Sequence, residues 1–186
     1  MKITAKKITV GGLLIALALI LPSAFHLTGL PQSGQIFLPM HIPVLLGGFA
    51  LGPVFGLVIG VISPVISSFL TGMPDFSRLP FMMVELAGYG FVSGIMYKYF
   101  RKVKFGTYIS LLVSMIAGRA LYALSLFVAV YLMGIQSGGP IAAVTATVTG
   151  LPGIVIQLVL IPPVIYALER SGYLDKHLRA CKNTAA

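Results

Sequence analysis

Residues 98–104 read KYFRKVK, and this basic stretch separates two apolar stretches that are each long enough to cross a bilayer. Basic residues gather at two other places: Lys2, Lys6 and Lys7 precede the first apolar run, and Arg170, Lys176, Arg179 and Lys182 close the chain. Short loops rich in Lys and Arg stay in the cytoplasm. We therefore expect the 98–104 loop and both ends of the chain on the cytoplasmic side of a membrane.

The composition excludes a soluble globular domain. Of the 186 residues, 58% are hydrophobic and 9% are charged, whereas about a quarter of the residues of a soluble domain are charged. The net charge is +9, and the basic residues that carry it flank the apolar segments. This placement favours anionic lipid headgroups over nucleic acid as their partner. Cys181 is the single cysteine, so an internal disulfide and a cysteine metal cluster are both excluded.

The hydropathy pattern predicts an all-α polytopic membrane protein. We expect a single transmembrane domain over residues 1–186, with six helices at about 8–25, 37–51, 54–70, 81–99, 107–133 and 151–169. The Lys-rich start and first apolar run also fit a secretory signal, but no soluble domain follows them. Pro39 and Pro43 predict irregular backbone at the start of the second helix. The arrangement indicates a multi-pass membrane protein.

Glu85 and Arg119 are the charged residues that fall well inside predicted spans. Ionisable groups at membrane depth are costly, and they usually face a cavity or a partner. The two could form a structural ion pair between neighbouring helices, or they could line a substrate cavity. Counted from the outer surface at ~1.5 Å per residue, they differ in depth by several ångströms. This offset argues against a simple pair and favours a polar pocket that opens to the outside.

Other polar residues lie at or near the outer ends of predicted helices. His41 follows Pro39 and is either a satisfied hydrogen-bonding residue or a ligand contact. Gln157 could bond a kinked backbone or a ligand. Asp75 and Arg78 belong to a short outer loop, where they are either solvated or folded over a cavity.

Enzymatic signatures are absent from the sequence. It contains no HExxH, GxSxG or GxxxxGK[ST] pattern. We therefore expect that the chain is not an enzyme, that it holds no cofactor, and that any ATP hydrolysis comes from a partner.

Three stretches together resemble the substrate-binding S component of energy-coupling factor (ECF) vitamin transporters. They are the small-xxx-small pattern from Gly12 to Ala16, HIPVLLGGFALGPVFGLVIG at 41–60, and LPGIVIQLVLIPPVIYAL at 151–168. The resemblance covers nearly the whole chain. It departs from the family pattern at Gly12, where the family has Ala.

The resemblance implies a six-helix subunit that captures a micronutrient from outside. In that scheme the subunit docks on a transmembrane coupling subunit that carries two ATPase subunits, and it topples in the membrane to release its cargo. Gly12 and Ala16 would face the coupling subunit. The pocket would be lined by Glu85, Arg119 and Gln157, with Gln32, Gln35, His41, Asp75 and Arg78 at its lid.

Two other functions remain open, and the ligand is not determined. A stand-alone secondary transporter or channel would have only Glu85 for a coupling ion, and an intramembrane enzyme would have only His41 as a base near the membrane. An arginine favours a carboxylate or phosphate ligand. Among ECF substrates pantothenate, a carboxylate, fits best, while pyridoxine, a thiamine-precursor pyrimidine and riboflavin stay open.

Overall fold

A computed structural model describes residues 5–26, 33–132, 134 and 139–172. Every regular element in these ranges is an α-helix. Six segments are long and apolar enough to cross a membrane if α2 and α3 count as one, which confirms the predicted all-α class. The helices are α1 (Ala5–His26), α2 (Ser33–Phe37), α3 (His41–Leu51), α4 (Pro53–Thr71), α5 (Leu79–Phe100), α6 (Gly106–Tyr131), α7 (Gly139–Thr149) and α8 (Leu151–Arg170).

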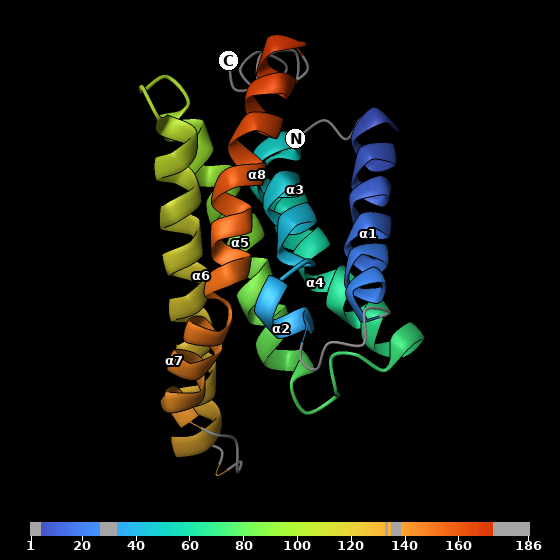
Figure 1. Cartoon of the computed structure of the whole chain (residues 1–186), viewed down its shortest axis with the longest axis vertical. Coiled ribbons are helices and arrows are strands. Elements are labelled where there is room, and N and C mark those ends of the chain that lie inside the picture. The colour runs from blue at the N-terminus through green and yellow to red at the C-terminus, as the bar shows by residue number, and fades with distance from the viewer. Residues whose placement is uncertain (1–4, 27–32, 133, 135–138, 173–186) are drawn as a thin grey trace.

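The helices run between two ends of the bundle that differ in charge. The start of α1, the turn between α5 and α6, and the end of α8 lie together at the top of Figure 1. This end, which we call the basic end, carries Lys98, Arg101, Lys102, Lys104 and Arg170. The opposite end, which we call the loop end, carries α2, α7 and the turn between α4 and α5.

The second span is interrupted rather than continuous over 37–51. Helix α2 ends at Phe37, and the Leu38 N–H makes its last hydrogen bond, to the Gly34 carbonyl at 3.2 Å. The helix stops there because Leu38 has a left-handed φ of 49° and Pro39 has no N–H to donate. The chain turns back when the His41 N–H donates to the Leu38 carbonyl at 3.1 Å. His41 therefore becomes the first residue of α3, and the irregular backbone expected from the prolines lies immediately before it.

Glycines bring the backbones of α4 and α5 into direct contact. A Cβ at Gly56 would clash with the carbonyl of Gly90, and a Cβ at Gly60 would clash with the carbonyl of Leu86. Small residues allow helices to approach closely in lipid, where packing replaces the hydrophobic effect as the source of association. Gly48 of α3 meets the same Gly90 carbonyl. The three helices therefore form a tight centre, with α1 packed on α3 and α4 and with α6 packed on α5.

Candidate substrate-binding site

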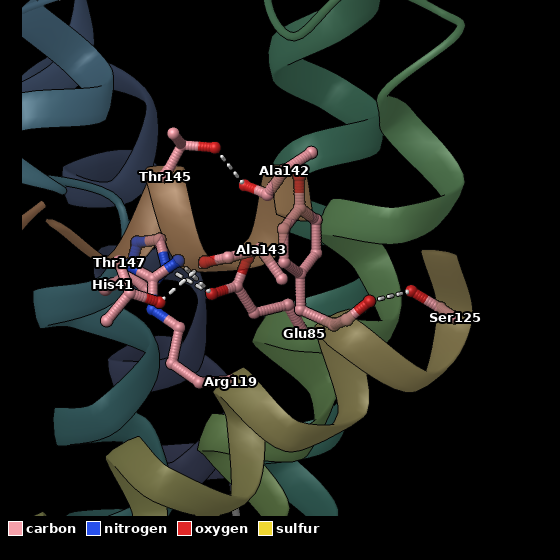
Figure 2. Close-up of polar contacts among 9 residues, drawn as sticks. His41, Glu85, Arg119, Ser125, Ala142, Ala143, Thr145 and Thr147 are labelled. Carbon is pink, nitrogen blue, oxygen red and sulfur yellow. Dashed lines mark hydrogen bonds and ion pairs between the residues drawn. The ribbon is translucent and has the colours of Figure 1, made fainter. Parts of the chain in front are cut away.

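Two polar side chains from two helices converge on one carboxylate oxygen of Glu85, on a third helix, inside the bundle (Figure 2). Arg119 Nη1 of α6 lies 3.0 Å from Glu85 Oε1 of α5, and His41 Nε2 of α3 lies 3.7 Å from the same oxygen. The side chains of His41, Glu85 and Arg119 are 3%, 6% and 14% exposed. We call these three residues the polar cluster. Its charges are held almost entirely away from the surroundings of the bundle.

The contact between Glu85 and Arg119 corrects the expectation that a depth offset separates them. Helix α5 ends and α6 begins at the turn of the basic end, and counted from that turn the two residues lie at nearly equal heights. Glu85 is about 15 residues from the Phe100 end of α5 and Arg119 is about 13 residues from Gly106, which differ by only ~3 Å along the axes. The prediction was wrong because depth was counted from the loop end, where α6 extends beyond α5.

Tyr89 and Gly118 belong to the site, and the sequence reasoning missed both. Tyr89 follows Glu85 on α5 and is 2% exposed. Its ring packs edge-on against His41, with centroids 5.0 Å apart and an interplanar angle of 73°. A Cβ at Gly118 would lie 2.8 Å from the Tyr89 ring, so the glycine makes room for it. Tyr89 is one helical turn from Glu85, and this i, i+4 spacing is the signal that could have found it.

Many polar atoms of the cluster lack hydrogen bonds within the part of the chain that the structure describes. They are both ring nitrogens of His41, Glu85 Oε1, and Nε and Nη2 of Arg119. Although Arg119 Nη1 is close to Glu85, the pair lacks the alignment of a hydrogen bond at Oε1. A buried polar group left without a partner costs about 1–3 kcal/mol. The cluster therefore retains unused capacity to bind a polar partner.

Gln157 also carries a buried polar group that is unsatisfied. It lies on α8 and is 1% exposed, and its Nε2 has no hydrogen-bond partner among the described residues. No described contact joins it to the polar cluster. The start of α8 does approach the cluster, since a Cβ at Gly150 would lie 3.0 Å from Arg119 Nη2. Gln157 and Arg119 thus carry unsatisfied N–H donors on two neighbouring helices, α8 and α6.

Of the predicted lid residues, His41 lies in the polar cluster, while the other described ones are not gathered there. Gln35, Asp75 and Arg78 are exposed, and none of them has a described contact with Glu85 or Arg119. Gln32 lies outside the described residues. Their role in ligand binding stays a prediction.

A separate cavity of about 290 Å³ opens between α5 and α6 towards the loop end. Its walls are almost entirely apolar, and Val84 and Leu124 in them are exposed to the surroundings of the bundle. Such a lining suits hydrocarbon rather than a water-soluble molecule. The lining residues are Pro80, Phe81, Val84, Leu121, Leu124, Ser125 and Val128.

Gly12 lies on the outward side of α1, and Ala16, one turn along the helix, is half-buried. Gly12 is exposed, and a Cβ built on it meets no atom within 4 Å. Leu14 and Ala18, on the opposite side of the helix, are buried against the bundle. The small-residue pattern therefore does not serve internal packing at Gly12 in the described part of the chain. A role in docking stays a prediction.

The family of the chain follows from its match to known sequences. The family model described as "ECF transporter, substrate-specific component" matches residues 6–165. No match was found among curated proteins or among solved structures. The matched range contains the outward face of α1, the α3–α4 unit and the whole polar cluster. With its six spanning segments, this chain belongs to the substrate-specific components of ECF transporters, which are membrane subunits that work with coupling and ATPase subunits.

Proposed function

We propose that the chain captures a small water-soluble vitamin or vitamin precursor that carries a carboxylate, with pantothenate as the first candidate. The binding residues are Arg119, Glu85, His41 and Gln157, and the lid is formed by Gln32, Gln35, Asp75 and Arg78. The observation that carries the proposal is the set of buried, unsatisfied polar atoms on His41, Arg119 and Gln157. Each of these atoms would gain a hydrogen bond from a ligand that reaches it.

The free edge of Arg119 supports a carboxylate. Nη1 faces Glu85, while Nε and Nη2 have no hydrogen-bond partner among the described residues. Nε and Nη2 point along one side of the planar guanidinium, and this pair of donors matches the two oxygens of a carboxylate. A lysine at this position would offer one point charge and no fork.

Glu85 supports a ligand that also has donor groups. Its negative charge balances Arg119, so the arginine can be kept at membrane depth without a bound anion. Its Oε1 still lacks a hydrogen bond and can accept one from a hydroxyl or amide of the ligand. Pantothenate combines a carboxylate with an amide and hydroxyl groups, whereas a purely apolar ligand would leave all these atoms unpaired.

Delivery of the cargo is part of the same proposal. With the basic end in the cytoplasm, the loop end faces outside and admits the ligand. Two ATPase subunits hydrolyse ATP, and the coupling subunit, contacted through Gly12 and Ala16, lets the chain topple and release its cargo. The setting is a prokaryotic cell membrane, and the chain itself supplies neither catalysis nor a cofactor.

The test begins with the protein purified in detergent. Mass spectrometry of any retained molecule should find a carboxylate, and isothermal titration should show binding of pantothenate. Pyridoxine, riboflavin and a thiamine-precursor pyrimidine serve as comparison ligands in the same titration. Tight binding of one of these uncharged or cationic compounds, with none of pantothenate, would show that the carboxylate assignment is wrong.

The alternative of a stand-alone transporter is tested separately by co-purification from cells that express the chain with its native partners. A coupling subunit and ATPase subunits should be recovered with it. Uptake of the ligand by the chain alone in proteoliposomes, with no partner recovered, would favour the stand-alone transporter.

A further inference from the structure

The turn between α4 and α5 is fixed to the end of α4 by side-chain hydrogen bonds. The buried hydroxyls of Ser67 and Ser68 donate to the carbonyls of Met73 and Pro74 at 2.7 and 2.8 Å. The Met73 N–H donates to Thr71 Oγ1 at 3.3 Å. These bonds fold residues 72–74 back onto the last turn of α4.

The other side of the turn is fixed by backbone hydrogen bonds. The Asp75 carbonyl accepts from the N–H groups of Arg78 and Leu79 at 2.8 and 3.0 Å. These bonds lead directly into the first turn of α5, which begins at Leu79. The turn thus has a defined course between the two helices.

Large apolar side chains gather on this turn without being buried by the bundle. Phe69 and Leu70 are each 72% exposed, Phe76 is 65% exposed and Met73 is 51% exposed. The rings of Phe69 and Phe76 pack edge-to-face with centroids 5.7 Å apart. We call these four residues the turn patch. In water, so much exposed apolar surface at one place would be unfavourable.

The turn patch continues the lipid-facing side of α4. Val54, Val58 and Ile62 are exposed along this helix at helical spacing, and Phe69 follows on the same side. The 19 residues of α4 are roughly 28 Å long, close to the ~30 Å of a bilayer core. The last turn of α4 therefore lies near the boundary between hydrocarbon and headgroups, and Phe76 folds back to that depth.

We propose that the turn patch inserts into the lipid leaflet at the loop end and anchors the α4–α5 turn there. Phe and Leu side chains of interfacial segments bury into the boundary between headgroups and acyl chains. The exposed Asp75, Ser77 and Arg78 of the same turn would then lie at the level of the headgroups, where charge is tolerated. The partner of this surface is lipid, so the proposal goes beyond ligand capture and does not depend on which ligand binds.

The chain contains no tryptophan, so a single introduced tryptophan reports its own surroundings. Phe76→Trp is placed in lipid nanodiscs of phosphatidylcholine, with or without bromine near the headgroup end of the acyl chains. We expect emission shifted to shorter wavelength and a loss of most of the fluorescence in brominated lipid. Ser77→Trp, in the same turn, is the matched control and should be quenched by aqueous acrylamide and little by bromine.

Two more variants make the result independent of any single substitution. Met73→Trp should behave like Phe76→Trp, because both belong to the turn patch. Ser68→Ala combined with Phe76→Trp removes the bond to the Pro74 carbonyl, and quenching by bromine should decrease. Quenching of the Phe76 and Met73 reporters by acrylamide but not by brominated lipid would overturn the proposal. Unchanged bromine quenching after Ser68→Ala would show that the serine bond does not hold the turn in lipid.

Discussion

Arg119 and Glu85 face each other across the contact of α5 with α6, and each supplies the counter-charge of the other. A lone charge at this depth would be costly, so the 3.0 Å contact explains why both can be kept in the bundle. The unsatisfied Nε and Nη2 of Arg119 show that the pair uses only part of the guanidinium. A structural role and a binding role are therefore compatible at the same residue.

Arg119→Lys should weaken ligand binding while the fold is kept. The charge remains beside Glu85, but the planar fork is lost. A hydrogen bond to a charged group contributes about 1.5–3 kcal/mol, so we expect a loss of affinity of roughly 10-fold to 100-fold by isothermal titration. Arg119→Ala should weaken binding further. Arg170→Lys at the basic end is the matched control and should bind normally, and an unchanged affinity in Arg119→Lys would contradict the proposed contact.

Glu85→Ala should lower thermal stability, because it leaves the buried Arg119 charge without a counter-charge. Removing one partner of a buried pair costs about 3–5 kcal/mol. Glu85→Ala combined with Arg119→Ala should recover stability relative to either single variant, yet bind ligand poorly. Stability is read from thermal unfolding in detergent and binding from titration. A double variant that regains stability and still binds tightly would leave Arg119 with a structural role alone.

At the scale of elements, the glycines of α4 and α5 decide how closely the helices approach. Gly56 and Gly90 place backbone against backbone, and α5 carries Glu85 one turn before Tyr89. The position of the polar cluster thus depends on small residues that make no polar contact with a ligand. The outward face of α1 also carries a glycine, Gly12, but a Cβ built on it meets no described atom within 4 Å.

Gly56→Ala should destabilise the fold, because the new Cβ would push α4 away from the Gly90 carbonyl. Overpacking of this kind typically costs about 1–3 kcal/mol, which thermal unfolding should detect. Gly12→Ala adds the same methyl group where no atom lies within 4 Å, so it should leave stability unchanged. Equal stability of the two variants would show that the α4–α5 contact can relax.

Gly12→Val should abolish ATP-driven uptake and leave ligand binding to the isolated subunit intact. A branched side chain on the outward face of α1 would hold a partner helix away where close packing is needed. Uptake is measured in proteoliposomes with the coupling and ATPase subunits, and binding is measured on the chain alone. A parallel loss of binding and uptake would mean that Gly12 matters for the fold.

For the whole molecule, the separation of charge between the two ends sets the expected orientation. The basic end holds most of the described Lys and Arg residues, while Arg78 is the one described at the loop end. This asymmetry favours a cytoplasmic basic end. Both the proposed entry of ligand at the loop end and the proposed docking through α1 depend on this orientation.

Ser77→Cys should react with a membrane-impermeant thiol reagent added to intact cells. The native Cys181 should react only after the membrane is permeabilised, because the C-terminal basic residues are expected inside. Mass-tag labelling followed by gel shift measures both. Labelling of Cys181 in intact cells would show that the orientation is the opposite one, and the proposed direction of transport would then be wrong.

The sequence by itself determined the class, the spans and the break before His41. Long apolar runs and flanking charges are local features of the chain. Each span must satisfy the hydrogen bonds of its own backbone and must be long enough to cross the bilayer. Pro39 interrupts the helix through its missing N–H, whatever surrounds it. These properties belong to short stretches of chain, and periodicity is enough to read them.

Only the tertiary structure decided which polar residues meet. Glu85 and Arg119 lie at nearly the same height because one turn joins the end of α5 to the start of α6. His41 lies near the same oxygen because the break before α3 fixes its position. Tyr89 joins them because Gly118 on another helix leaves space for its ring. Such contacts depend on the rotation and height of each helix against its neighbours. Side-chain packing between helices sets both quantities, and a hydropathy pattern contains neither.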